Sequence, residues 1–274
     1  MTVLEFANEV AANVENAKVQ EIEKANGVVF TGIAIDQGGI SPTVYVDEMY
    51  RNGLSVEDAA REVERIAEKS RVEGFNAKQF LDYEGFVKGN LRIRLYNKAT
   101  KAEVCRSAKA RGFDDLIMVP YVNIEIPGHK GAVRVLNKHL DVWGVSQREV
   151  IDTAIKNSMG DTTIQTLAAF MGNMMFGGGP DFIKVSTETQ IQNEPLVISN
   201  SSLYFGASSI LGLIPRLKEK FIDGFYAIPS SVHEIIIMPK GLGEDAESLA
   251  AMIKEVNATT LSPEEVLSSK AYAF

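Results

Sequence analysis

Residues 227–239 read Ala-Ile-Pro-Ser-Ser-Val-His-Glu-Ile-Ile-Ile-Met-Pro. The apolar residues at both ends of this stretch indicate two neighbouring buried strands, which we expect over residues 225–228 and 232–238. The polar residues between the apolar runs are Ser230, Ser231, His233 and Glu234. Because buried polar groups cost free energy unless they are hydrogen-bonded, this stretch is also the first candidate for a functional site.

Further strand signals lie on the N-terminal side of this stretch. Asn26-Gly27 is the favoured turn pair of a β-hairpin, and it separates two apolar runs. Leu91, Ile93 and Leu95 alternate with larger polar residues, which is typical of a half-buried strand. The additional strands that we expect cover residues 19–25, 28–35, 91–96, 115–126, 132–136 and 196–199.

Helices are expected between the strand pairs. Capping boxes, in which a Ser or Thr and an acid three residues later satisfy free backbone amides, mark helix starts. They occur at Thr2 with Glu5, Ser55 with Asp58, Ser146 with Glu149, and Ser262 with Glu265. Two more helices are expected, over residues 207–221 and 249–256.

The order of these elements predicts the fold class. Adjacent strand pairs separated by helices favour an α+β fold, with a largely antiparallel mixed sheet and helices packed on it. A division near Gly112 would give an N-terminal α+β part, residues 1–112, and a C-terminal α+β part, residues 113–274. A single compact unit is the alternative.

Composition narrows the function classes. The chain of 274 residues has a net charge of −8, which disfavours nucleic acid and anionic membranes as partners. The single cysteine, Cys105, excludes an intramolecular disulfide and a zinc site of several cysteines. Without a signal peptide or an apolar run of about 18 residues, the protein is expected to be soluble and cytoplasmic.

No cofactor or metal is expected. The three histidines, His129, His139 and His233, lack the spacing of known metal-binding motifs. Residues 201–208 join a strand to a helix, and a helix start can hold an anion. However, this junction lacks the glycine and lysine pattern of phosphate-binding loops.

One functional hypothesis is a serine- and histidine-dependent hydrolase or transferase. In a strand, Ser231 and His233 would share one face, with Cα atoms roughly 6.5 Å apart, whereas Glu234 would point to the other face. The orienting acid must then come from elsewhere, and the acids near strands are Asp114, Asp115 and Glu125. The alternative is structural, with Ser231 and His233 bonding turn or buried backbone groups.

Residues 160–180 suggest a binding surface. The apolar residues of this segment would lie on one helical face, and three glycines follow it. Methionine-rich faces pack adaptably and recur on promiscuous binding surfaces. The candidate partner-binding residues are Met171, Met174, Met175 and Phe176. The alternative is a core helix followed by a loop.

A basic stretch offers a third hypothesis, a nucleic-acid or nucleotide binder. Its candidate residues are Arg92, Arg94, Lys101, Arg106 and Lys109. Positive side chains along one face would neutralise phosphates. The alternative is a solvated strand and helix face, which is the usual role of such a charge run.

Several short motifs along the whole chain carry a family resemblance. They are residues 40–47 (Ile-Ser-Pro-Thr-Val-Tyr-Val-Asp), 113–116 (Phe-Asp-Asp-Leu), 143–146 (Trp-Gly-Val-Ser), 198–200 (Ile-Ser-Asn), 205–207 (Phe-Gly-Ala), 228–234 and 255–257. In this order they resemble a bacterial domain family found in Firmicutes, domain of unknown function 5688. The resemblance implies a bacterial, plasmid or phage source and supplies no activity.

These observations rank the hypotheses. We expect first a non-catalytic protein-binding module, which could interfere with a host system if it comes from a mobile element. The hydrolase or transferase is second, and the nucleic-acid or nucleotide binder is third. The protein partner is not identified, and the oligomeric state stays open, with a homodimer as one option.

Overall fold

The strand pair expected from residues 227–239 is present as β10 (Phe225–Pro229) and β11 (Ile235–Pro239), in which Pro229 faces Ile235. The structure is a computed structural model that describes residues 1–37, 41–70, 77–100, 109–126, 129–176, 183–184, 194–242 and 245–274. The prediction that the second strand starts at Val232 is wrong. Residues 230–234 form the turn between the strands, because the Ser231 hydroxyl bonds the Glu234 carboxylate across it at 2.8 Å.

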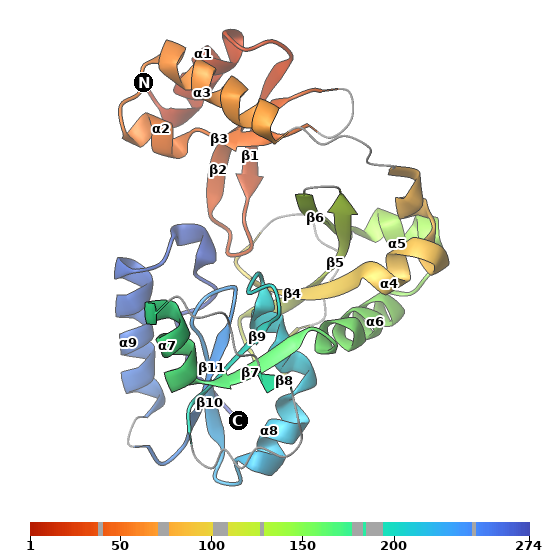
Figure 1. Cartoon of the computed structure of the whole chain (residues 1–274), viewed down its shortest axis with the longest axis vertical. Helices are drawn as coiled ribbons and strands as arrows, with labels where there is room; N and C mark the ends of the chain where they lie inside the picture. The colour runs from red at the N-terminus through yellow and green to blue at the C-terminus, as the bar shows by residue number, and fades with distance from the viewer. Residues whose placement is uncertain are drawn as a thin grey trace.

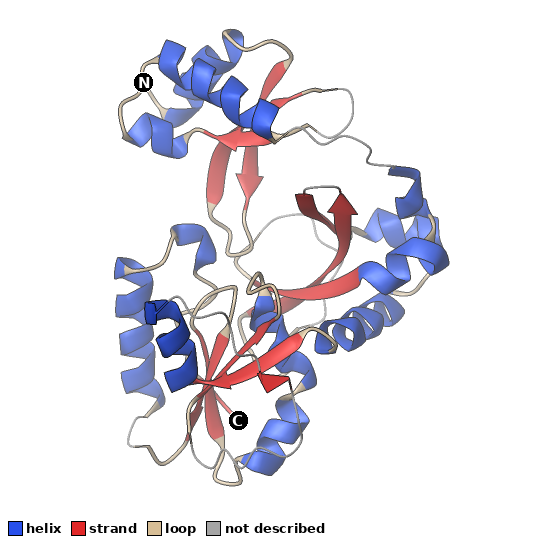
Figure 2. Ribbon diagram, in the orientation of Figure 1, coloured by secondary structure: helices blue, strands red, loops and turns tan. Residues whose placement is uncertain are grey.

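All strand pairings in the described part of the chain are antiparallel, and they form three sheets. Helices lie against these sheets, as the colours of Figure 2 show. The predicted α+β class with antiparallel pairing is therefore confirmed.

The first sheet has the order β1-β2-β3 and belongs to an N-terminal unit, which is at the top of Figure 1. Its elements are α1 (Val3–Ala12), β1 (Ala17–Glu23), β2 (Val29–Ile35), β3 (Thr43–Tyr45), α2 (Asp47–Arg51) and α3 (Val56–Lys69). The expected hairpin is confirmed, with Glu23 opposite Val29. The capping box of Thr2 with Glu5 is also confirmed.

The second sheet has the order β4-β5-β6, and α6 packs on β4 and β5. Its strands and the helical segments around them are η1 (Ala77–Leu81), η2 (Tyr83–Val87), α4 (Lys88–Asn90), β4 (Leu91–Asn97), β5 (Leu116–Ile126), β6 (His129–Arg134), α5 (Asn137–Trp143) and α6 (Gln147–Met159). The Ser146 hydroxyl accepts the amide of Glu149 at the start of α6, as predicted.

The third sheet has the order β12-β10-β11-β9-β7-β8. Besides β10 and β11, this region contains β7 (Thr162–Thr166), α7 (Leu167–Phe176), β8 (Ile183–Lys184), β9 (Leu196–Asn200), the 3-10 segment η3 (Gly206–Gly212), α8 (Ile214–Lys220), α9 (Ala246–Thr259), the 3-10 turn η4 (Pro263–Glu265) and β12 (Tyr272–Ala273). Side chains of β11 alternate between its faces. Ile235 and Ile237 belong to the main core, the buried apolar cluster that runs from Tyr83 to Tyr272. Ile236 instead packs with residues of α9.

Buried apolar side chains form two large clusters. One lies wholly within residues 6–67, between α1, α3 and the first sheet. The other runs from Tyr83 to Tyr272 and joins the second and third sheets. The clusters therefore separate between Ala67 and Tyr83, and residues on both sides of Gly112 share the larger one. The expected division near Gly112 stays a prediction, because buried clusters alone do not define domains.

The turn of the β1–β2 hairpin connects the N-terminal unit to the rest of the chain. The Asn26 amide donates to the Val266 carbonyl at 2.9 Å, and the Ala25 carbonyl accepts the Asn97 amide at 2.9 Å. This contact brings residues near both ends of the sequence together, as the downward-pointing hairpin in Figure 1 shows.

Three helix predictions are wrong in detail. Residues 164–166 belong to β7, because they pair with β9 and so satisfy their backbone in a sheet. Residues 207–221 are divided into η3 and α8, with Pro215 in the first turn of α8. Ser262 makes no capping hydrogen bond and precedes only the short η4.

No helix in the described residues combines the length and the apolar character needed to span a membrane.

Candidate functional site

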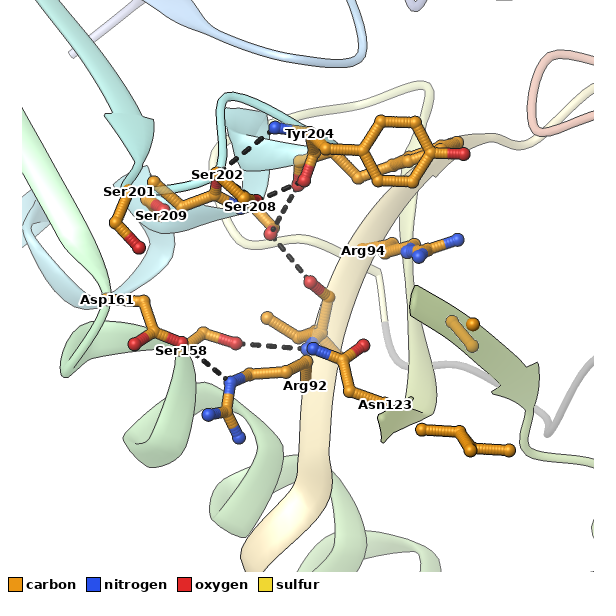
Figure 3. A pocket seen from close by; sticks show the side chains of 16 residues that line it. Arg92, Arg94, Asn123, Ser158, Asp161, Ser201, Ser202, Tyr204, Ser208 and Ser209 are labelled. Atoms are coloured by element: carbon orange, nitrogen blue, oxygen red, sulfur yellow. Dashed lines mark hydrogen bonds and ion pairs between the residues drawn. The ribbon is translucent and has the colours of Figure 1, made fainter. Parts of the chain in front are cut away.

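A cavity of about 640 Å³ opens between the second and third sheets. Its walls come from β4, the β5–β6 pair, the end of α6 and the connection from β9 to η3 (Figure 3). These elements are far apart in the sequence. Cavities of about 300–1,000 Å³ with a few placed polar groups are the usual ligand sites of proteins, so this is the candidate site.

The alternation of β4 supplies the cationic wall. Leu91, Ile93 and Leu95 are buried in the main core, and successive side chains of a strand point to opposite faces. Arg92 and Arg94 therefore share the other face and both line the cavity. Figure 3 shows their side chains leaving β4 in different directions.

Two buried serines hold β4 in place beside the cavity. The Ser158 hydroxyl accepts the Ile93 amide at 3.1 Å, and the Ser208 hydroxyl donates to the Ile93 carbonyl at 2.6 Å. Both backbone groups of Ile93 are thus satisfied on the edge of the second sheet. The position of the neighbouring arginines is fixed by this backbone.

Arg92 is neutralised within the site. Its Nε lies 2.9 Å from Oδ2 of Asp161, and its Nη1 donates to the Leu91 carbonyl at 2.9 Å. Asp161 is the only acidic residue that lines the cavity among the described residues. The charge of Arg92 is therefore already paired within the protein, and Arg92 is not the main cationic group available to a ligand.

Arg94 has a different environment. Its guanidinium carbon lies 4.1 Å from the ring centroids of both Tyr121 and Phe205. In the part of the chain that the structure describes, no carboxylate is within ion-pair distance of it. Burial lowers the pKa of Arg94, although arginine remains charged at neutral pH. A guanidinium has more N–H donors than these ring contacts can occupy, so donors remain that can bond an anion.

The connection from β9 to η3, residues 201–205, has a strained backbone. Leu203 and Phe205 have φ of +53° and +52°, a region that costs a residue other than glycine about 1–2 kcal/mol. The Asn200 side chain offsets part of this cost, because it donates to the Tyr204 carbonyl at 2.9 Å and accepts the Tyr204 amide at 3.2 Å. Strain that is held in this way concentrates at binding sites.

His233 supports the same connection. Its Nδ1 accepts the Phe205 amide at 3.1 Å, and its Nε2 lies 3.4 Å from the Glu265 carboxylate. Its carbonyl accepts the Ser199 hydroxyl at 2.8 Å. Both ring nitrogens thus bond protein groups, and the imidazole positions the wall of the cavity.

The predicted catalytic residues are not brought together. The Ser231 hydroxyl is buried, donates to Glu234 and accepts the backbone amide of His233 at 2.9 Å, so it bonds no imidazole nitrogen. The structure thus shows the turn-bonding arrangement that was the alternative to a nucleophile.

The acids proposed to complete that site have other partners. Asp114 pairs with Lys270 at 2.6 Å, which lowers the pKa of this carboxyl. Asp115 accepts the hydroxyls of Tyr272 and Ser268. The side chain of Glu125 lies outside the described residues.

The predicted basic residues separate into different places. Arg92 and Arg94 meet at the cavity, whereas Lys109 lines a second cavity of about 710 Å³ with Arg111 and Lys218. Lys101 and Arg106 lie outside the described residues. A continuous basic track is therefore not formed by the residues that the structure describes.

The methionine-rich segment contributes an exposed helix surface. Met171 and Met175 on α7 are 49% and 73% exposed. The side chains of Met174 and Phe176 lie outside the described residues, as do the glycines 177–179. Ile164, expected on the same helical face, belongs to β7 instead.

Sequence reasoning missed most of the site. Asn123, Ser201 and Ser209 line the cavity, and their side chains make no hydrogen bond to any described residue. Tyr204 also lines the cavity and is 57% exposed. The strand-to-helix junction at residues 201–208 was a partial signal. The sequence could not predict that this junction lies beside β4, because about 110 residues separate the two segments.

The described residues contain no group of three or more His, Cys, Asp or Glu side chains suited to hold a metal ion. The cavity offers mainly hydroxyl, amide and guanidinium groups. Its chemistry is that of a site for an anion or a polar organic molecule.

Comparison with known proteins identifies one family. The model described as "Family of unknown function (DUF5688)" matches residues 2–274, which confirms the expected resemblance over nearly the whole chain. Searches of curated proteins and of solved structures found no match.

Proposed function

The chain belongs to the family of unknown function DUF5688, and we propose that it is a non-catalytic binding protein whose cavity holds a small organic anion through Arg94. The anionic group is a phosphate or a carboxylate. The observation that carries the proposal is a guanidinium that lies over two aromatic rings and lines a cavity, with no carboxylate partner among the described residues.

The energetics of Arg94 support a ligand. Taking a cation out of water without an anionic partner costs free energy. The cation–π contacts return about 0.5–2 kcal/mol. Charge-assisted hydrogen bonds to a planar or tetrahedral anion are worth more, about 1.5–3 kcal/mol each. An anion bonded to Arg94 would therefore stabilise the site.

The charge distribution supports the same conclusion. The whole chain has a net charge of −8, but the described cavity lining has two arginines and one aspartate. A local positive potential in an acidic protein favours a small anion that fits inside the cavity. It does not favour a long polyanion, which the remaining surface would repel.

We expect Arg94→Met to lose at least about 10-fold in affinity for pyrophosphate, because one charge-assisted hydrogen bond is worth about 1.5–3 kcal/mol. Isothermal titration calorimetry with pyrophosphate and with succinate, at fixed ionic strength, measures this. The affinity of Arg94→Lys should lie between those of the wild type and Arg94→Met, because lysine keeps the charge but lacks the planar set of donors.

The matched control is Arg111→Met, at an exposed arginine that lines the second cavity. It should bind like the wild type. The proposal fails if the wild type binds no phosphate compound and no carboxylate, or if Arg94→Met and Arg111→Met bind equally well.

Arg94→Met should also fold normally. Removing the guanidinium relieves the free-energy cost of burying a cation. The methionine side chain can still pack on the rings of Tyr121 and Phe205. Since burial lowers the folded-state pKa of Arg94, the cost applies at every pH below that pKa. The difference in stability between wild type and variant should therefore be constant from about pH 6 to pH 9, as pH-dependent thermal melts would show.

A second candidate function is the docking of a protein partner on α7. It is favoured by the exposure of Met171 and Met175 on one helix, since methionines adapt to varied apolar partners. This function is compatible with the first, because none of the α7 side chains that the structure describes lines the cavity.

The double variant Met171→Gln/Met175→Gln tests the second function. We expect it to lose any partner captured from lysate of the source organism and any self-association seen by sedimentation velocity. Met252→Gln on α9 is the control, because Met252 is similarly exposed on another helix. Equal capture by both variants would contradict the assignment to α7.

A further inference from the structure

We infer that the anion is a single nucleotide, whose phosphate bonds Arg94 and whose base stacks on Tyr204. This inference rests on the proposed anion site and adds the class of the organic part. It follows from the size of the cavity, from one exposed ring at its edge and from one amide on its opposite wall.

The size of the cavity suits a ligand larger than an inorganic ion. A water molecule occupies about 30 Å³ in the liquid, and a phosphate group is only a few times larger. The cavity has about 640 Å³, within the range of about 300–1,000 Å³ that holds drug-sized organic ligands. A ligand that fills the cavity therefore carries an organic body beside its anionic group.

Tyr204 offers a flat surface for that body. It lines the cavity and is 57% exposed, and its ring centroid lies 5.5 Å from the Arg94 guanidinium carbon. Figure 3 shows the ring on the same side of the cavity as Arg94. Stacking a nucleobase on such a ring is worth about 1–3 kcal/mol and accepts any base.

The ring is held rigidly, which reduces the entropic cost of binding. Its backbone is bonded twice by the Asn200 side chain. The ring itself meets Phe205 edge-on at 4.7 Å between centroids and lies 5.5 Å from the ring of His233. A large aromatic side chain that is both supported and exposed at a cavity is suited to stack on a ligand.

The polar lining fits the rest of a nucleotide. The Asn123 amide both donates and accepts hydrogen bonds, as the edge of a base requires. The hydroxyls of Ser201 and Ser209 can bond ribose or phosphate oxygens. None of these three side chains bonds a described residue, and all line the cavity.

A free nucleotide fits better than a nucleic-acid strand. A strand needs a basic track for successive phosphates. The described basic residues of the predicted stretch instead divide between two cavities, and Arg92 is neutralised by Asp161. The site therefore offers one strong anion contact beside one stacking ring.

Calorimetric titration of the full chain with AMP, GMP, CMP, UMP, ribose 5-phosphate and pyrophosphate tests the inference. At least one nucleotide should bind at least about 10-fold more tightly than ribose 5-phosphate, which lacks the base. Tyr204→Ser should weaken that nucleotide about 10-fold and leave ribose 5-phosphate unchanged, whereas Tyr204→Phe should retain the affinity.

The Tyr204→Ser protein should fold, because the hydrogen bonds from Asn200 involve only the backbone of residue 204. Tyr45→Ser, at an exposed tyrosine of β3, is the control. If ribose 5-phosphate and every nucleotide bind equally, or if Tyr204→Ser weakens all ligands alike, the inference is wrong and the anion site stands. If no phosphate compound and no carboxylate binds, both fail.

Discussion

Gly206→Ala is expected to destabilise the protein by about 3 kcal/mol and to remove anion binding. A Cβ atom at this position would lie only 2.6 Å from the Asn200 amide nitrogen and from the His233 carbonyl oxygen, and still closer to the Ser199 hydroxyl. Two of these are backbone atoms. Ser199 and Asn200 belong to β9 and pair with β7, and the preceding residues of β9 pair with β11 as well, so they cannot easily move away.

The loss of binding follows from the same clash. Gly206 begins η3 directly after Phe205, whose ring contacts Arg94. Displacing this backbone would break the bonds that Asn200 and His233 make to residues 204 and 205. The position of Arg94 over these rings would then be lost with the wall of the cavity.

Thermal unfolding and pyrophosphate titration measure both effects. The expected fall in Tm is about 6–12 °C, from about 2–4 °C per kcal/mol in a domain of this size. Gly172→Ala is the matched control. A Cβ there meets nothing within 4 Å, and the residue is in α7, so it should stabilise by about 0.5–1 kcal/mol. A Gly206→Ala protein that melts and binds like the wild type would refute the role of this close approach.

Phe225→Ala is expected to have the second large effect, a loss of about 3–5 kcal/mol. Phe225 is fully buried on β10. Its ring stacks on Phe274 with centroids 5.1 Å apart and planes 9° apart, and it meets Phe221 at 5.8 Å. Truncation would leave an apolar cavity inside the main core, where neighbours relax only partly.

Denaturant unfolding is the appropriate measurement, since a lower midpoint at unchanged slope reports a loss of stability. Ile222→Ala is the control, because Ile222 is 90% exposed in the same region and should change stability by less than about 0.5 kcal/mol. A cost below about 1 kcal/mol for Phe225→Ala would mean that the aromatic group around the C-terminal Phe274 is not part of the core.

Local signals account for the parts of the fold that were predicted well. Asn26-Gly27 forms its hairpin because the turn and the two strands are adjacent in sequence. The alternation of Leu91, Ile93 and Leu95 correctly placed one face of β4 in the core. In each case a local pattern, the turn pair or the alternation of apolar residues, is enough to predict the structure.

Local sequence patterns gave wrong predictions where hydrogen-bonding partners determine the secondary structure. Ile164 fits an apolar helical face, but the backbone of residues 164–166 pairs with β9, about 30 residues away. Ser231 and His233 fit an alternating strand, but side-chain hydrogen bonds within the segment favour a turn. Short apolar or mixed runs satisfy both periods, so the tertiary context made the choice.

The sequence by itself determined the α+β class, the hairpins, the family and the two arginines on one face of β4. It did so because strand alternation, turn residues and family motifs are local patterns. Only the tertiary structure decided that Arg94 stands beside Tyr204 and the serines of the β9–η3 connection. It also decided that His233, in the turn after Pro229, supports that wall. The physical reason is that a cavity is made by elements whose contacts span about a hundred residues, and no local period records such contacts.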